Sequence, residues 1–119
     1  MKIKTSELTG AALDWAVAKC EGEDYCAHDG AYGIGNAFEA TRYSTDWAQG
    51  GPIIERECIC IHQRMGETAW WADYANPQVK PEGTGHRFLF KQAPTPLIAA
   101  MRCYVASKLG DDVEVPEGL

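Results

Sequence analysis

The chain has 119 residues, of which 45% are hydrophobic, and its formal net charge is −6. These values predict one folded domain over residues 1–119 and exclude a disordered chain. The acidic balance argues against direct nucleic-acid binding, which needs clustered lysines and arginines. No apolar run approaches the ~18–20 residues of a membrane-spanning helix, so no membrane partner is expected. The first residues also lack the apolar segment of a secretion signal, which predicts a cytoplasmic protein.

The first part of the chain predicts one helix between less regular segments. Residues 2–4 alternate in polarity and predict a short strand. Apolar residues at helical spacing predict a helix over residues 9–20, with Thr9 as its cap and Gly22 just past its end. Residues 29–35 contain three glycines and predict a loop.

The segment Tyr43–Glu57 is the most unusual in composition. Residues 38–43 predict a strand edge leading into it, and Asp46 predicts a cap for a single helical turn over residues 47–49. A turn is predicted at Gly50-Gly51-Pro52, because glycine reaches positive φ freely and proline fixes its own φ. A second helical turn is predicted over residues 53–56.

The second half predicts a sheet followed by the clearest helix. Clean alternation predicts strands, and the residues 65–67 between the first two predict the turn of a β-hairpin. The expected elements are strands at 57–64, 68–74 and 86–91, a helix from Thr95-Pro96 to Gly110, and a short tail strand within 111–116. Together these elements predict an α+β fold, with two main helices packed on an antiparallel sheet of three to five strands.

Three stretches carry a family resemblance: residues 4–18, the segment Tyr43–Glu57, and residues 94–111. On these stretches the chain resembles the NinX family of lambdoid and enterobacterial phages, over most of its length. The resemblance implies a small accessory phage protein in the host bacterial cytoplasm. It implies neither a reaction nor catalytic residues.

The five cysteines are expected to be free thiols, since an odd number in a reducing compartment argues against disulfides. Cys58, Cys60 and His62 alternate along a predicted strand face and are the best candidates for a metal site. The spacing of such side chains, about 6.6–7 Å, is awkward for one zinc ion. No metal and no cofactor are therefore expected.

The aromatic residues are the better candidates for function. Trp70 and Trp71 are adjacent on a predicted strand, so their side chains must point to opposite faces, and one of them is expected outside the core. Arg102 is predicted as a solvated flank of the last helix, an ion-pair partner of Glu55 or Glu57, or the fork that receives a ligand phosphate. The candidate ligand- or partner-binding residues are Tyr43, Asp46, Trp47, Gln49, Gly50, Gly51, Glu55, Arg56, Trp70, Trp71 and Arg102.

The leading hypothesis from the sequence is a non-enzymatic phage protein that acts by binding, in host modulation or counter-defence. One version docks on a host protein through an exposed tryptophan. A second sequesters a small nucleotide signal in a pocket with aromatic and arginine side chains, and a homodimer would suit so small a chain. The alternative is a small hydrolase using Asp46, Glu55 or His62, which requires titratable groups to converge in one cleft.

Overall fold

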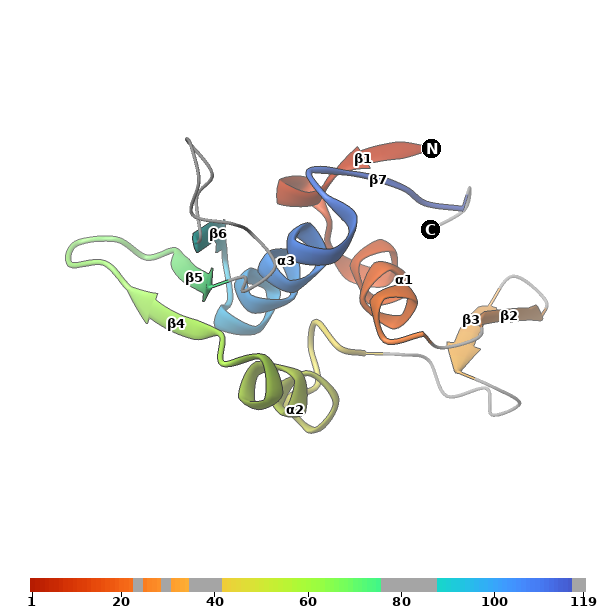
Figure 1. Ribbon diagram of the computed structural model, residues 1–119, viewed down its shortest axis with the longest axis horizontal. Helices are drawn as coiled ribbons and strands as arrows, with labels where there is room; N and C mark the ends of the chain where they lie inside the picture. The colour runs from red at the N-terminus through yellow and green to blue at the C-terminus, as the bar shows by residue number, and fades with distance from the viewer. Residues whose placement is uncertain (23–24, 29–30, 35–41, 76–87, 117–119) are drawn as a thin grey trace.

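The computed structural model describes residues 1–22, 25–28, 31–34, 42–75 and 88–116. Helix α3 lies at the centre, between a three-stranded sheet and α1, with α2 alongside (Figure 1). The elements in chain order are β1 (Lys2–Lys4), η1 (Thr5–Glu7), α1 (Gly10–Cys20), β2 (Tyr25–His28), β3 (Ala31–Ile34), α2 (Trp47–Glu57), β4 (Cys60–Gln63), β5 (Trp70–Ala75), β6 (Phe88–Ala93), α3 (Pro96–Leu109) and β7 (Asp112–Glu114). The α+β class is confirmed.

Helix α3 begins where the sequence predicts. The Ile98 N–H donates to Thr95 Oγ1 at 3.2 Å, and Pro96 occupies the first turn, where its missing N–H leaves no bond unmade. The helix ends before Gly110, which has a φ of 87°. Helices and strands on several sides bury most of the surface of α3, so this helix forms the centre of the hydrophobic core.

The three-stranded sheet has the order β4-β5-β6, with both pairs antiparallel, which confirms the predicted hairpin and third strand. The sheet packs on α3, where Ala72 is fully buried and the Cys103 thiol donates to its carbonyl oxygen at 3.6 Å. The small side chain of Ala72 lets the helix approach the middle strand closely.

The ends of the chain form a second small sheet, in which Ile3 of β1 lies opposite Val113 of β7. Thr5 anchors this pair to the end of α3, because its hydroxyl donates to the Gly110 carbonyl at 2.6 Å. Both the predicted first strand and the predicted tail strand are confirmed. The end of α1 is also as predicted, with Gly22 just past it at a φ of 75°.

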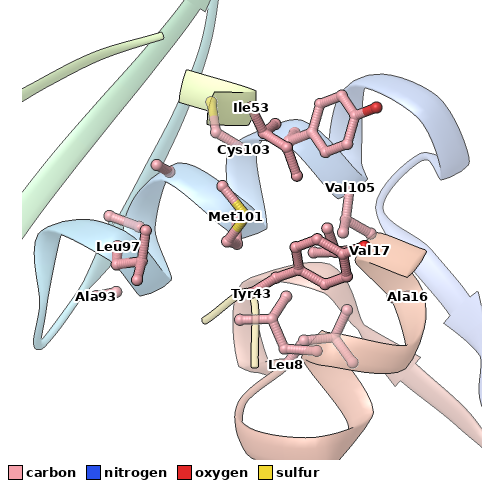
Figure 2. Packing of buried hydrophobic residues seen from close by; sticks show 14 of the residues in the cluster. Leu8, Ala16, Val17, Tyr43, Ile53, Ala93, Leu97, Met101, Cys103 and Val105 are labelled. Carbon is pink, nitrogen blue, oxygen red and sulfur yellow. The ribbon is translucent and has the colours of Figure 1, made fainter. Parts of the chain in front are cut away.

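Side chains from all three helices meet in one core (Figure 2). Val17 of α1, Ile53 of α2 and Met101 of α3 are each almost completely buried. Burial of one such side chain contributes about 1.5–3 kcal/mol relative to exposure. Tyr43 fills the space between α1 and α3, so part of the Tyr43–Glu57 segment belongs to the core.

The predicted turn at Gly50-Gly51-Pro52 is wrong, because these residues lie inside the single helix α2. Asp46 caps this helix as expected, accepting the Ala48 N–H at 2.9 Å. A Cβ on Gly50 would lie 2.4 Å from the Tyr43 carbonyl oxygen, so the glycine permits close packing and not a turn. Pro52 is exposed and loses one intrahelical bond without ending the helix.

Four further expectations need correction. Residues 31–34, predicted as loop, form β3 and pair with β2; Asp29-Gly30 between them is a common hairpin signal in sequence. Cys58 is the left-handed cap of α2, with a φ of 56°, so the strand begins later, at Cys60. Thr9 precedes α1 but makes no side-chain cap bond, and Tyr43 lies in a turn. Residues 38–41 of the expected strand edge lie outside the described residues.

Candidate functional site

The Tyr43–Glu57 segment divides into a buried face and an exposed face of α2. Tyr43 and Gly50 are buried, whereas Trp47 is 49% exposed. Gly51 lies one helical turn after Trp47, and its backbone is close to the indole. A Cβ on Gly51 would lie 3.9 Å from Trp47 Cε3. Only the exposed face is accessible to a partner.

Asp46 and Gln49 hold the start of α2. The Gln49 side-chain oxygen accepts the Arg42 N–H at 2.8 Å, while its amide nitrogen lies 3.4 Å from Asp46 Oδ2. Asp14 of α1 supports the same turn by accepting the Ser44 N–H at 2.8 Å, and burial raises the pKa of this carboxyl above its usual value. The polar groups of Asp14, Asp46 and Gln49 therefore stabilise the start of α2 through hydrogen bonds within the protein.

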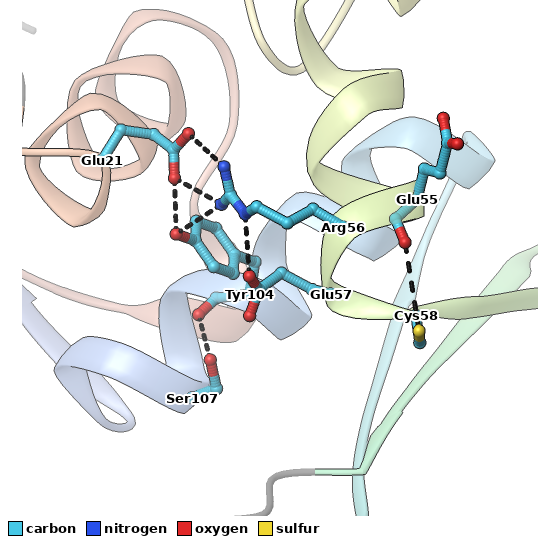
Figure 3. Close-up of polar contacts among 7 residues, drawn as sticks. All are labelled: Glu21, Glu55, Arg56, Glu57, Cys58, Tyr104 and Ser107. Carbon is cyan, nitrogen blue, oxygen red and sulfur yellow. Dashed lines mark hydrogen bonds and ion pairs between the residues drawn. The ribbon is translucent and has the colours of Figure 1, made fainter.

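Arg56 is bound within the molecule (Figure 3). Its guanidinium donates to both carboxylate oxygens of Glu21, at 2.9 and 2.7 Å, and to Glu57 at 2.8 Å. Tyr104 completes the cluster, because its hydroxyl donates to Glu21 at 2.5 Å. The hydrogen bonds from Arg56 lower the pKa of Glu21 despite its partial burial. Glu55 takes no part in this cluster.

A pocket of about 760 Å³ lies elsewhere, at the junction of η1, the β5 end of the hairpin, β6 and α3. This volume is within the range of small-molecule sites, about 300–1,000 Å³. Its lining combines an indole, two cationic side chains and several polar groups. The lining residues are Ser6, Thr68, Ala69, Trp71, Lys91, Gln92, Ala93, Pro94 and Arg102.

The side chains of the two adjacent tryptophans have different surroundings, as expected for neighbouring residues of a strand. Trp70 packs against the core, whereas Trp71 lines the pocket. The Trp71 indole donates its N–H to Glu67 at 2.7 Å, and the guanidinium carbon of Arg64 lies 3.7 Å from its ring centroid. Trp71 is therefore the member of the pair that a ligand can reach.

Arg102 is half-buried and reaches two backbone carbonyls. Its Nε donates to Leu8 and its Nη1 to Gln92, each at 2.8 Å. Burial lowers the pKa of Arg102 from its ordinary value. Among the residues that the structure describes, no carboxylate lies within 4 Å of its guanidinium, so the alternative of an ion pair with Glu55 or Glu57 is not realised.

The family model described as Bacteriophage P22, NinX matches residues 4–108. The chain belongs to this NinX family. It is accordingly a phage accessory protein. No curated protein matches the chain. Within the described ranges, none of the helices combines the length and apolarity needed to cross a membrane.

In this NinX-family chain, the pocket joins two predicted site residues to others that the sequence did not single out. Trp71 and Arg102 were predicted, whereas Lys91, Gln92 and Ser6 were not. Lys91 is the last residue of a predicted strand, and Gln92 follows it. The register of this strand could not be read from the sequence, so it was not known which residue faces the pocket. Their polar side chains shortly before a clearly capped helix were the available signal.

The residues of the metal and hydrolase alternatives do not converge on one site among the described residues. No group of three potential ligands that could hold a metal occurs among the described residues, and the Cys26 and His28 side chains lie outside them. His62 Nδ1 lies 3.6 Å from Asp73. Asp46 and Glu55 stand nine residues apart on α2, roughly 13 Å along its axis, so they do not share one cleft.

Proposed function

We propose that this NinX-family protein acts by binding, and that its pocket takes a small phosphate-bearing ligand. The observation that carries the proposal is Arg102. Its guanidinium is half-buried beside the pocket and has no carboxylate within 4 Å among the described residues. Glu7 acts on this guanidinium electrostatically without forming an ion pair, and a phosphate would add a negative charge in direct contact with it.

The chemistry of the pocket supports this reading. Guanidinium groups bind phosphate through charge-assisted hydrogen bonds, and these are stronger in a partly desolvated site. The bonds from Arg102 to Leu8 and Gln92 hold the guanidinium in place before a ligand arrives, which lowers the entropic cost of binding. The net charge of −6 disfavours long polyanions, so a small ligand fits better than a nucleic acid.

Binding without turnover suits an accessory protein of a phage. Sequestration of a small nucleotide signal in the host bacterial cytoplasm would counter a defence response or alter host physiology. The proposed role requires only affinity and abundance, because a stoichiometric binder removes its ligand by mass action.

The test measures binding of inorganic phosphate and pyrophosphate by isothermal titration calorimetry at low salt. Arg102→Gln should weaken binding about ten- to a hundredfold, the effect of one charge-assisted hydrogen-bonding group. Arg42→Gln is the matched control, since it removes the same charge from an exposed site before α2. Equal affinity in both variants, or no binding by the parent protein, would contradict the proposal.

Docking on a host protein is a second candidate function, favoured by the exposure of Trp47. Among the described residues, the other large hydrophobic side chains with comparable exposure are Met1 and Met65. Trp47 differs from both in its position on a regular helix. Truncation of a central interface tryptophan typically costs more than about 1 kcal/mol of binding. Host proteins recovered with the parent chain, lost with Trp47→Ala and retained with Met65→Ala would support docking.

A further inference from the structure

We infer that the pocket also holds a planar heterocyclic ring against Trp71 and Gln92, so that the ligand class is a nucleoside phosphate. This inference rests on the proposed function, because it adds a ring subsite beside the anion subsite at Arg102. Sugar phosphates and inorganic anions would fill only the second of these subsites.

Trp71 already carries a planar group on its ring. The guanidinium carbon of Arg64 lies 3.7 Å from the ring centroid, which is a stacking distance. Arg64 is exposed, belongs to the hairpin connection and is not among the residues that line the pocket, so its contact shows only that a planar group can lie on this indole. The hydrogen bond to Glu67 fixes the indole, which leaves the ring orientation set before a ligand binds. Aromatic side chains presented in this way stack nucleobases.

Gln92 connects the two subsites. It lies directly opposite Trp71 in the β5–β6 register, and both residues line the pocket. Cross-strand partners have Cβ atoms about 4.5–5.5 Å apart, so the Gln92 side chain is beside the indole. Its amide offers both donors and an acceptor, which suits the edge of a heterocycle. The carbonyl of the same residue accepts from Arg102 Nη1 at 2.8 Å.

The geometry therefore places a stacking surface, a hydrogen-bonding amide and a guanidinium within one strand-to-helix unit. A nucleoside phosphate carries the complementary groups in one molecule: a flat ring with polar edges joined to an anion. The pocket volume of about 760 Å³ accommodates one such molecule.

Calorimetry with three probes tests the ring subsite on the intact protein. The probes are AMP, ribose 5-phosphate and inorganic phosphate, and AMP should bind at least about fivefold more tightly than ribose 5-phosphate. Trp71→Leu should reduce AMP binding to the level of ribose 5-phosphate and leave phosphate binding unchanged. Trp47→Leu, on the exposed face of α2, is the control and should change neither. Gln92→Ala provides a second variant at an exposed position if the Trp71 variant folds poorly.

The outcomes separate the two claims. If AMP and ribose 5-phosphate bind equally and both depend on Arg102, the ring subsite is refuted while the anion site stands. If none of the three probes binds the parent protein, the proposed function fails and this inference fails with it.

Discussion

Glu21 and Arg56 form a two-point contact between the end of α1 and the last turn of α2, with N–O distances of 2.9 and 2.7 Å. The Tyr104 hydroxyl, from α3, is bonded to both of them. One cluster thus joins all three helices around the core (Figure 3). Because most of the donors of Arg56 are used here, we assign it to stability and not to ligand contact.

The first prediction concerns the contribution of this cluster. Tyr104→Phe removes the hydroxyl and leaves the ring in the core, so it should lower the free energy of unfolding by about 1 kcal/mol. Glu21→Gln should cost a similar amount, since half of Arg56 is exposed and solvent weakens the ion pair. Urea denaturation measures both. Glu55→Gln is the control, because the exposed carboxylate of Glu55 makes no hydrogen bond or ion pair among the described residues. An effect of Glu55→Gln equal to that of Glu21→Gln would refute the assignment.

The same cluster predicts a pH dependence of stability. Hydrogen bonds from Arg56 lower the pKa of Glu21 below its ordinary value of 4.5. The unfolded chain therefore binds more protons than the folded one between the folded pKa and 4.5. The stabilisation is fully present above pH 4.5 and is lost as the pH falls through the folded pKa. The loss of stability on acidification should be smaller in Glu21→Gln, as measured by urea midpoints from pH 7 downward. Parallel curves for the parent and the variant would contradict this linkage.

Local signals in the sequence predicted the elements whose ends are marked by caps. Thr95, Pro96 and Gly110 define α3 within the chain itself, and alternation defines the strands of the hairpin. The continuity of α2 was not predictable in this way. Gly50 and Pro52 favour a turn locally, whereas the contact of Gly50 with Tyr43 and Leu97 makes a close-packed helix the better solution.

The candidate site shows the same division between local and long-range information. The sequence predicted that one of Trp70 and Trp71 would leave the core, because strand geometry alone requires it. It did not predict that Arg102 would reach the carbonyl of Gln92, since this contact depends on how α3 packs on β6. The contact of Arg56 with Glu21 was not predictable for the same reason, because the two residues are 35 positions apart in the sequence.

The packing role of Gly50 leads to a matched pair of substitutions. Gly50→Ala should destabilise the protein by about 1–3 kcal/mol, because its Cβ would lie 2.4 Å from the Tyr43 carbonyl oxygen and 2.7 Å from Leu97 Cδ1. Gly51→Ala should be neutral or stabilising by up to about 1 kcal/mol, since its Cβ has ordinary contacts and alanine favours the helix. Thermal unfolding of the two variants measures the difference. Similar melting temperatures would show that Gly50 does not pack closely against the Tyr43 carbonyl and Leu97.

The thiols should differ in reactivity by position. Burial raises the pKa of Cys103 to about 12, and it raises that of Cys20 to about 12 as well. Both therefore remain protonated at pH 8, whereas Cys58 and Cys60 are exposed. Alkylation of the native protein with iodoacetamide, followed by peptide mass spectrometry, should label Cys58 and Cys60 well before Cys20 and Cys103. Early labelling of Cys103 would indicate that the contact between α3 and the sheet opens readily.

The ion pair between Lys91 and Asp111 bears on the proposed ligand. The Lys91 ammonium lies 3.7 Å from an Asp111 carboxylate that is 87% exposed, so the protein itself partly neutralises one of the two cationic residues of the pocket. A pair of this kind contributes about 0.2–1 kcal/mol, which an incoming phosphate must replace. Asp111→Asn should consequently tighten phosphate binding by about two- to fivefold at low salt, with the difference shrinking as salt is added. Asp112→Asn changes the same charge one residue further along, in β7, and should have a smaller effect in the same calorimetric titration. Equal effects of the two variants would mean that the net charge of the molecule, and not competition at Lys91, governs affinity for the anion.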